Sequence, residues 1–253
     1  MTKFIAAAKT QAGTNHPVNE DRLLLDGNVL CYGLVGDCER EMGCMAVFDG
    51  VSEGGHGAAA STLAAQAFAQ ATQVFEADSI DVLQDRLRMA GERAENDVES
   101  YAARYGLPVA ASTVAGLMVA HDGSAAIFNA GDSRVYRLRD GVLAVLSYDH
   151  TPESRLGGVG FEYSDESVSH CIELAVGFNQ GGRNLEINTT TLFPGDRYLI
   201  CSDGIDGEID LARLQQMLAS DSTCAQLCEE LYAEARMSGS TDDATLIVIE
   251  IGE

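Results

Sequence analysis

Short apolar runs separated by Gly, Asn and Asp make up the N-terminal part of the chain. Runs of this length between turn-forming residues predict β-strands rather than helices. Their close succession is typical of neighbouring strands in an antiparallel sheet. We expect four strands, over residues 4–9, 21–26, 29–37 and 44–49.

The pattern changes after Gly57 to a helical one. Residues 58–77 are rich in alanine and carry apolar residues at helical spacing, which predicts a first helix. A second helix is predicted over residues 82–105, with Ser79 as the N-cap and Gly106 ending it. Two consecutive helices therefore separate two groups of strands.

Strand-like runs return after the second helix, and hairpin signals at "HDG" and "RDG" join some of them. A glycine-rich, irregular stretch covers residues 151–183, and a third helical section covers residues 208–237. The expected strands are 111–120, 124–130, 133–140, 142–149, 185–193, 197–203 and 243–251.

This order of elements predicts an α+β fold. The simplest packing is a central antiparallel β-sandwich, with two sheets face to face and helix pairs on the outside. No repeat or linker interrupts the chain, so we expect residues 1–253 to form a single domain.

The amino-acid composition limits the kinds of partner that the protein is expected to bind. The 253 residues are 46% hydrophobic and 22% charged, as in an ordinary soluble globular protein. The 39 acidic and 16 basic residues give a formal net charge of -23, which repels nucleic acid and anionic membranes. We therefore expect no nucleic-acid partner and no membrane partner.

Cysteine usage bears on the compartment. The seven cysteines are an odd number without a CxxC pair, and several lie in apolar runs such as "YLICSDG", which indicates reduced thiols in the core. The N-terminal stretch "MTKFIAAAKT" is too short in apolar residues for a signal peptide, and no window resembles a membrane-spanning helix. We expect a cytoplasmic protein that is a monomer.

Aspartates recur where the apolar runs end. Each one alone has a structural explanation, because Asp-Gly is a favoured turn pair. The ends of several strands can also meet at one place in a fold. Carboxylates brought together there repel one another unless a cation lies between them. The residues in question are Asp49, Asp132, Asp203, Asp242 and Asp243, with Glu20 and Asp21 just before a strand.

Oxygen ligands without histidine or cysteine favour Mg²⁺ or Mn²⁺ over zinc, and the histidines and cysteines of this chain lack the spacing of a zinc site. Two such ions about 4 Å apart can share a water molecule, lower its pKa and present it to a phosphoryl group. The sequence therefore permits a carboxylate centre that hydrolyses phosphoesters.

Six short motifs occur in one order along nearly the whole chain. The motifs are "NED" at 19–21, "VFDG" at 47–50, "GDSR" at 131–134, "YDHT" at 148–151, "CSDGI" at 201–205 and "DDAT" at 242–245. In these motifs and their order, the chain resembles the metal-dependent type 2C family of serine/threonine protein phosphatases, in its bacterial form.

The resemblance implies roles for individual residues. Asp49 would bridge two Mn²⁺ or Mg²⁺ ions, and the carbonyl of Gly50 would be a ligand of one of them. Asp203 and Asp242 would hold the other ion.

The resemblance also implies roles for Asp21, Glu20 and Asp132. Asp21, with Glu20 beside it, would contact the ions through water. Asp132, together with Asp203, would help bind a possible third ion.

The chain also departs from the family pattern. His16 stands where the family has an arginine that grips the substrate phosphate. It either binds that phosphate, in a pH-dependent way, or is a loop residue. Val51 replaces a histidine that many members have, and His56 is more simply a loop residue than a general acid. Asp243 stands at a position where the family commonly has Asn.

These observations lead to a first hypothesis of an enzyme, a metal-dependent phosphatase that hydrolyses phosphoserine or phosphothreonine in a phosphorylated protein. The alternative is a weakly active or inactive module of the same fold that binds phosphoproteins, with His16 in its favour. A third possibility, two-metal chemistry on nucleic acid, is disfavoured by the net charge of -23. The stretch 151–183 falls where relatives carry a flap over the site, and it supports no substrate assignment.

Overall fold

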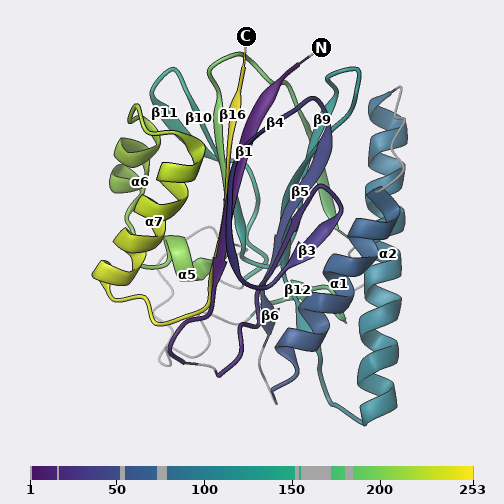
Figure 1. Ribbon diagram of the computed structural model, residues 1–253. Helices are drawn as coiled ribbons and strands as arrows, with labels where there is room; N and C mark the ends of the chain where they lie inside the picture. Colours follow the sequence, from purple (N-terminus) through teal and green to yellow (C-terminus); the bar gives the residue numbers. More distant parts are fainter. Residues whose placement is uncertain are drawn as a thin grey trace.

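A computed structural model of the chain describes residues 2–15, 17–51, 55–72, 79–151, 154, 172–179 and 185–252. Two six-stranded antiparallel sheets lie face to face, and helices cover their outer sides (Figure 1). The predicted α+β sandwich is therefore confirmed.

The first sheet holds both ends of the described chain, because β1 and β16 are its neighbouring central strands. Its order is β11 (Val142–Val145), β10 (Arg134–Arg139), β15 (Arg197–Cys201), β16 (Ala244–Ile251), β1 (Phe4–Gln11) and β4 (Gly33–Arg40).

The second sheet has the order β14 (Glu186–Thr190), β9 (Ala125–Ala130), β8 (Val114–Val119), β5 (Gly43–Phe48), β2 (Arg22–Leu25) and β3 (Asn28–Leu30). It combines two pairs of consecutive strands, β2 with β3 and β8 with β9, with β5 between the pairs and β14 at the edge.

Helices form the two outer layers. The pair α1 (Gly57–Thr72) and α2 (Ile80–Tyr105) covers the second sheet. On the first sheet lie α5 (Asp203–Asp206), α6 (Leu211–Leu218) and α7 (Cys224–Ser238). None of the helices within the described ranges is both long and apolar enough to span a membrane.

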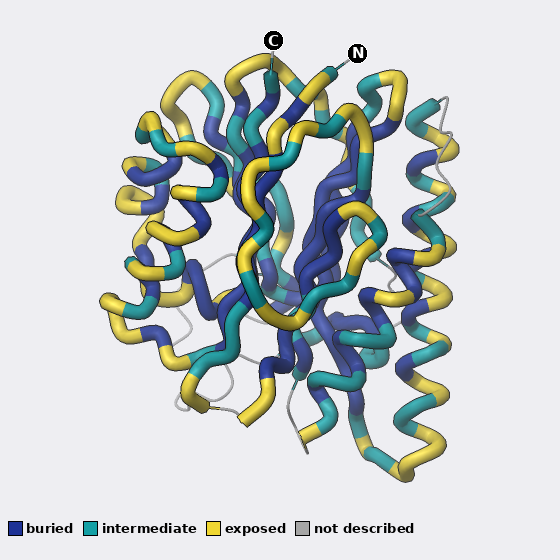
Figure 2. Tube along the Cα trace, in the orientation of Figure 1, coloured by how far each residue is buried: buried dark blue, intermediate teal, exposed yellow. Residues whose placement is uncertain are grey.

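Three apolar layers hold these elements together. Between the sheets, Phe4, Met45, Tyr198 and Ile247 are fully buried. Alternation along the strands places such residues inside, because successive side chains point to opposite faces. Figure 2 shows the buried residues following the two sheets and the inward faces of the helices.

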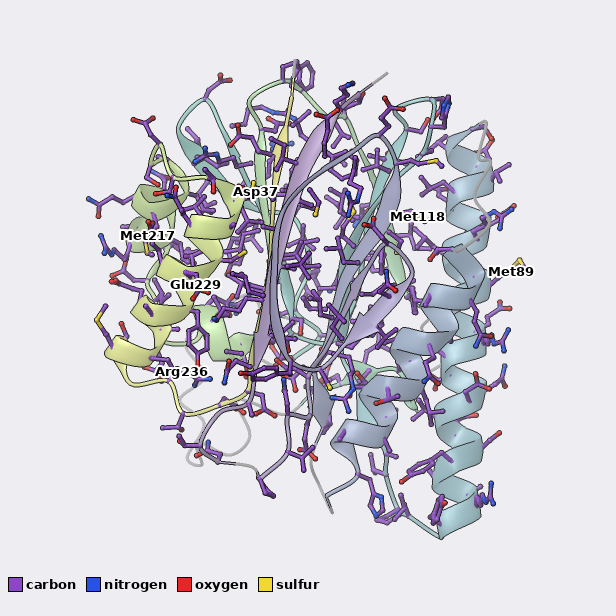
Figure 3. All side chains as sticks on the ribbon, in the orientation of Figure 1. Asp37, Met89, Met118, Met217, Glu229 and Arg236 are labelled. Carbon is purple, nitrogen blue, oxygen red and sulfur yellow. The ribbon has the colours of Figure 1, made fainter. Side chains whose placement is uncertain are left out.

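The two outer layers are also closely packed. Phe68 on α1 stacks on Phe128 of the second sheet with 5.3 Å between ring centroids. Met118 lies between that sheet and its helices, and Met217 lies on α6 over the first sheet, whereas Met89 of α2 points to solvent (Figure 3). The alanine-rich face of α1 brings its backbone close to the sheet.

The ends of the second helix agree with the prediction. The hydroxyl of Ser79 accepts a hydrogen bond from Val82 N–H, and Gly106 has φ +64°, the left-handed conformation that glycine adopts without strain. Of the first predicted helix, the structure describes the helix only as far as Thr72, and residues 73–77 of the prediction lie outside the described residues.

Several predictions of elements were incomplete. The run 111–120 is two strands, β7 (Ala111–Ser112) in a small sheet with β6 (Gly50–Val51) and β8 (Val114–Val119) in the second sheet. The run 29–37 is two strands in different sheets, because the chain turns at Cys31–Tyr32 and Gly33 has φ +112°. The section 208–237 contains two helices, since Thr223 forms a capping box that starts α7. Within 151–183, the short strands β12 (Leu174–Ala175) and β13 (Phe178–Asn179) pair with each other, and most of the rest lies outside the described residues.

The cysteines were predicted to be reduced core thiols. All six in the described part of the chain are free. The prediction is wrong for Cys31, which is exposed in the turn before β4, and Cys38 is half-buried. Cys171 lies outside the described residues. The buried ones are Cys44, Cys201, Cys224 and Cys228.

Candidate metal centre

The strand register brings the predicted aspartates to one end of the sandwich. In the second sheet, the start of β2 pairs with the end of β5, Arg22 with Phe48. In the first sheet, the end of β15 pairs with the start of β16, Cys201 with Leu246. The residues just outside these pairs are Asp21, Asp49, Asp203 and Asp242, while Asp132 lies on the connection from β9 to β10, which passes from one sheet to the other.

Asp49 stands at the centre of this group. Its backbone is fixed, because Asp49 N–H donates to Thr113 Oγ1 (3.0 Å) and Thr113 N–H donates to Asp49 O (2.8 Å). Burial, followed by the negative charges of four other aspartates, raises the pKa of Asp49 well above its usual range. Those four are Asp21, Asp203, Asp132 and Asp242.

Asp21 is completely buried. The hydroxyl of Ser202 donates to its Oδ2 (2.8 Å), and its Oδ1 is buried without a hydrogen-bond partner in the part of the chain that the structure describes. Burial raises the pKa of Asp21 to about 7, helped by the charges of Asp243 and Asp242 and opposed by hydrogen bonds from Thr245 and Ser202. A buried acceptor without a partner costs about 1–3 kcal/mol.

Asp203 and Asp132 have raised pKa values for similar reasons. Surrounding protein atoms, then the charges of Asp132, Asp242 and Asp21, raise the pKa of Asp203 to about 8. The side chain of Asp203 nevertheless retains more solvent exposure than the other four, so solvent shields part of this repulsion. Burial raises the pKa of Asp132 to about 6, and the charge of Arg134 opposes the rise.

Asp243 does not extend this carboxylate group, because its two oxygens bind backbone amides. Gly13 N–H donates to its Oδ1 (2.7 Å) and Glu20 N–H donates to its Oδ2 (2.6 Å). Its own N–H donates to Asp242 Oδ1 (2.8 Å). Asp243 therefore ties the segment before β2 to the start of β16.

Glycines allow the backbone to approach closely at this end. A β-carbon on Gly50 would lie 2.3 Å from Gly57 O, and one on Gly204 would lie 1.8 Å from Asp243 O. A β-carbon on Gly57 would lie 2.5 Å from Gly50 O and 3.0 Å from Glu20 Cδ. The carbonyl of Gly50 and the carboxylate of Glu20 therefore both lie against the first residue of α1.

A second ionic group, which the sequence did not reveal, lies beside the aspartates. Arg134 donates through Nε and Nη2 to Asp149 (3.0 and 2.6 Å to Oδ2) and through Nη1 to Asp206 Oδ2 (3.0 Å). Tyr136 O–H donates to the same oxygen of Asp206 (2.5 Å). Since Asp206 is the last residue of α5, this group fixes the helix that begins with Asp203. Arg134 and Asp149 lie in the motifs "GDSR" and "YDHT", which is the signal that the sequence offered.

Of the two histidines singled out in the sequence, the structure describes His56 but not His16. His16 lies outside the described residues, so its place stays a prediction. His56 Nδ1 is 2.9 Å from Tyr101 Oη, and its ring packs on Tyr101 and Tyr105 of α2. This contact agrees with His56 as a structural residue at the start of α1.

The donor set suits a hard divalent cation. Carboxylates whose pKa values are raised by burial, and further by one another's negative charges, gain from a positive charge among them. Among the described residues, Asp21 Oδ1 is also a buried oxygen without a hydrogen-bond partner. As they stand, no three His, Cys, Asp or Glu side chains of the described ranges enclose a common point at ligand distance.

Comparison with known proteins establishes the family. The family model for protein phosphatase 2C matches residues 34–242, which is most of the chain, so the chain belongs to the protein phosphatase 2C family. The serine/threonine phosphatase Stp of Listeria innocua is 26% identical over 128 residues, 49% of this chain and 50% of the relative. That match spans half of the relative's own length.

Solved structures share the fold over the whole chain. PppA of Pseudomonas aeruginosa has 25% sequence identity and a TM-score of 0.79, over 98% of this chain and 97% of its own. The catalytic domain of the phosphatase PstP, in complex with two manganese ions, has 23% identity and a TM-score of 0.82 over 100% of both chains. The resemblance seen in the motifs is confirmed at the level of family and fold.

Proposed function

We propose that this protein is a metal-dependent serine/threonine protein phosphatase whose single catalytic domain hydrolyses phosphoserine or phosphothreonine at a binuclear Mn²⁺ or Mg²⁺ centre. The observation that carries the proposal is the convergence of four aspartates on a fifth, Asp49, whose pKa is raised by burial and then by their negative charges. Family membership and the two manganese ions of the PstP structure support the same assignment.

Each residue then has a proposed role. Asp49 would lie between the two ions, with the Gly50 carbonyl on one and Asp203 and Asp242 on the other. Asp21 would contact the ions through water. When bound, the ions would supply charge that activates a water molecule and neutralises the phosphoryl oxygens.

The protein's own contribution is orientation. The hydrogen bonds between Asp49 and Thr113 fix the backbone at Asp49, and the close approaches of Gly50 to Gly57 and of Gly204 to Asp243 fix the backbone beside it, so this part of the site would be held in place before substrate arrives. The water oxygen would form a bond to phosphorus in line with the seryl or threonyl oxygen as the ester bond breaks. The attacking water would lose one proton and the leaving oxygen would gain one, which gives inorganic phosphate and the free alcohol. Asp132 with Asp203 would offer a further cation position beside this centre.

Purified protein should hydrolyse an aryl phosphate and a phosphoserine peptide when Mn²⁺ is added, and the rate should fall to background with EDTA. The expectation follows because the carboxylates alone repel a phosphate dianion. Rates are measured across pH and with Mg²⁺, Mn²⁺ and Ca²⁺. A folded protein that binds Mn²⁺ and phosphopeptide but shows no turnover under any condition would instead favour the binding module.

Replacing His16 with Arg should lower the KM for a phosphopeptide about ten-fold and leave kcat unchanged. One additional charge-assisted hydrogen bond is worth about 1.5–3 kcal/mol, and 1.4 kcal/mol corresponds to ten-fold. The KM of the wild type should rise with pH as the imidazole loses its proton, and that dependence should disappear in the His16→Arg variant. An unchanged or higher KM would show that residue 16 does not contact the phosphate.

A further inference from the structure

Side chains, rather than a strand ladder, hold the backbone of the "NED" segment. Five of its backbone groups bind a side chain: the carbonyls of Asn19, Glu20 and Asp21 and the amides of Glu20 and Asp21. Asp21 N–H donates to Asn19 Oδ1 within the segment (3.0 Å). The other partners come from three elements, namely β2, α1 and the start of β16.

Arg22 makes the largest share of these contacts. Its Nη1 donates to Asn19 O (2.8 Å) and Asp21 O (2.6 Å), so one nitrogen joins the carbonyls on either side of Glu20. Its remaining nitrogens reach α1, with Nε donating to Thr62 Oγ1 (2.8 Å) and Nη2 to Ala58 O (3.2 Å). The guanidinium is therefore anchored on α1 while it holds the segment.

Two further side chains complete the arrangement from other directions. Ser61 O–H on α1 donates to Glu20 O (2.5 Å). On the opposite side, Asp243 Oδ2 accepts from Glu20 N–H (2.6 Å). The backbone of Glu20 and Asp21 is thus fixed by side chains from β2, α1 and the start of β16, and by Asn19 within the segment.

We propose that Arg22 is a positioning residue for divalent cations: by joining the Asn19 and Asp21 carbonyls to α1, it sets Glu20 and Asp21 for the ions without touching them. The proposal rests on the metal centre proposed above. Arg22 carries a positive charge, which by itself opposes cation binding. Positioning and charge therefore predict changes of opposite sign when Arg22 is replaced.

The test is Mn²⁺ affinity, measured by isothermal titration calorimetry on wild type, Arg22→Gln and Arg22→Lys. Positioning predicts about ten-fold weaker binding for Arg22→Gln, the lower end of the 10–100-fold range for residues that orient metal ligands. The Mn²⁺ affinity of Arg22→Lys should lie between those of the wild type and Arg22→Gln. One ammonium can bind the two carbonyls, but it lacks the forked guanidinium that also reaches α1. Equal or tighter binding by folded Arg22→Gln would overturn the proposal.

Kinetics supply a second readout that a general loss of stability would not produce. The Mn²⁺ concentration for half-maximal activity should rise about ten-fold in Arg22→Gln, in line with its lower affinity, while kcat and KM at saturating Mn²⁺ stay close to wild type. A lower kcat at saturating Mn²⁺ with unchanged metal affinity would contradict the proposal.

Matched controls separate this role from folding. Arg213→Gln removes an exposed arginine paired with Glu234 on the far helix layer and should leave Mn²⁺ affinity unchanged. If Arg22→Gln fails to fold, Thr62→Val removes the Nε anchor together with the local hydrogen bond from Thr62 Oγ1 to Ala58 O, and unchanged affinity in both Thr62→Val and Arg22→Lys would overturn the proposal. Failure of the wild type to bind Mn²⁺ at all would refute the metal centre itself, which is a distinguishable result.

Discussion

Replacing Asp49 with Asn is expected to reduce phosphoester hydrolysis at least about a thousand-fold, while the variant still folds. Residues that merely orient metal ligands typically change affinity or activity 10–100-fold, so the loss of the proposed bridging ligand should exceed that range. The backbone hydrogen bonds between Asp49 and Thr113 do not involve the carboxylate and should persist. The measurement is kcat/KM for an aryl phosphate at saturating Mn²⁺.

The melting temperature of the same variant distinguishes a loss of catalysis from a loss of folding. The raised pKa of Asp49 means that its ionised form is disfavoured in the folded protein, and this penalty grows as pH rises above the usual carboxyl pKa. Asp49→Asn should therefore unfold in EDTA at pH 7–8 at a temperature equal to or above that of the wild type. Retained turnover would refute the assignment of Asp49, and a strongly lowered melting temperature would attribute the lost activity to folding.

Replacing Arg134 with Gln is expected to lower the free energy of unfolding by about 3 kcal/mol. Removing one partner of a buried ion pair costs about 3–5 kcal/mol, because a charge is left without compensation. The side chain of Asp206 is 2% exposed and that of Asp149 14%, whereas Arg134 is 33% exposed, which places the effect at the lower end of that range. Urea denaturation at pH 7 measures it.

The exposed pair Arg213–Glu234 provides the comparison for this measurement. Its side chains are 42% and 21% exposed, and solvent screens the attraction between exposed charges. Arg213→Gln should therefore change the free energy of unfolding much less than Arg134→Gln does. Equal effects of Arg134→Gln and Arg213→Gln would show that the Arg134 group is not a stabilising element of the site.

The sequence predicted the architecture well, because that depends on local patterns. Most strands and the ends of the second helix were predicted correctly. The signals for them, namely the apolar runs, the Ser79 cap and Gly106, each act within a few residues. Convergence of the aspartates was also predictable in outline, since each follows or precedes a strand. Motif order then supplied the grouping that the individual Asp-Gly pairs could not.

What the sequence could not provide are contacts between distant segments. Arg22 reads as an ordinary polar residue at the start of a strand until α1 is placed against it, 36 and 40 residues away at Ala58 and Thr62. The amides bound by Asp243 lie 230 and 223 positions away, at Gly13 and Glu20. Such pairings depend on tertiary packing, which no local periodicity encodes.

The residues proposed to hold the ions are divided between the two sheets, with Asp21 and Asp49 beside the second and Asp203 and Asp242 beside the first. Ions bound among them would connect the two sheets at that end of the sandwich. Any ligand that binds only the folded state adds to its stability in proportion to the logarithm of its concentration. Metal binding would then stabilise the packing between the sheets, where Met45 is fully buried.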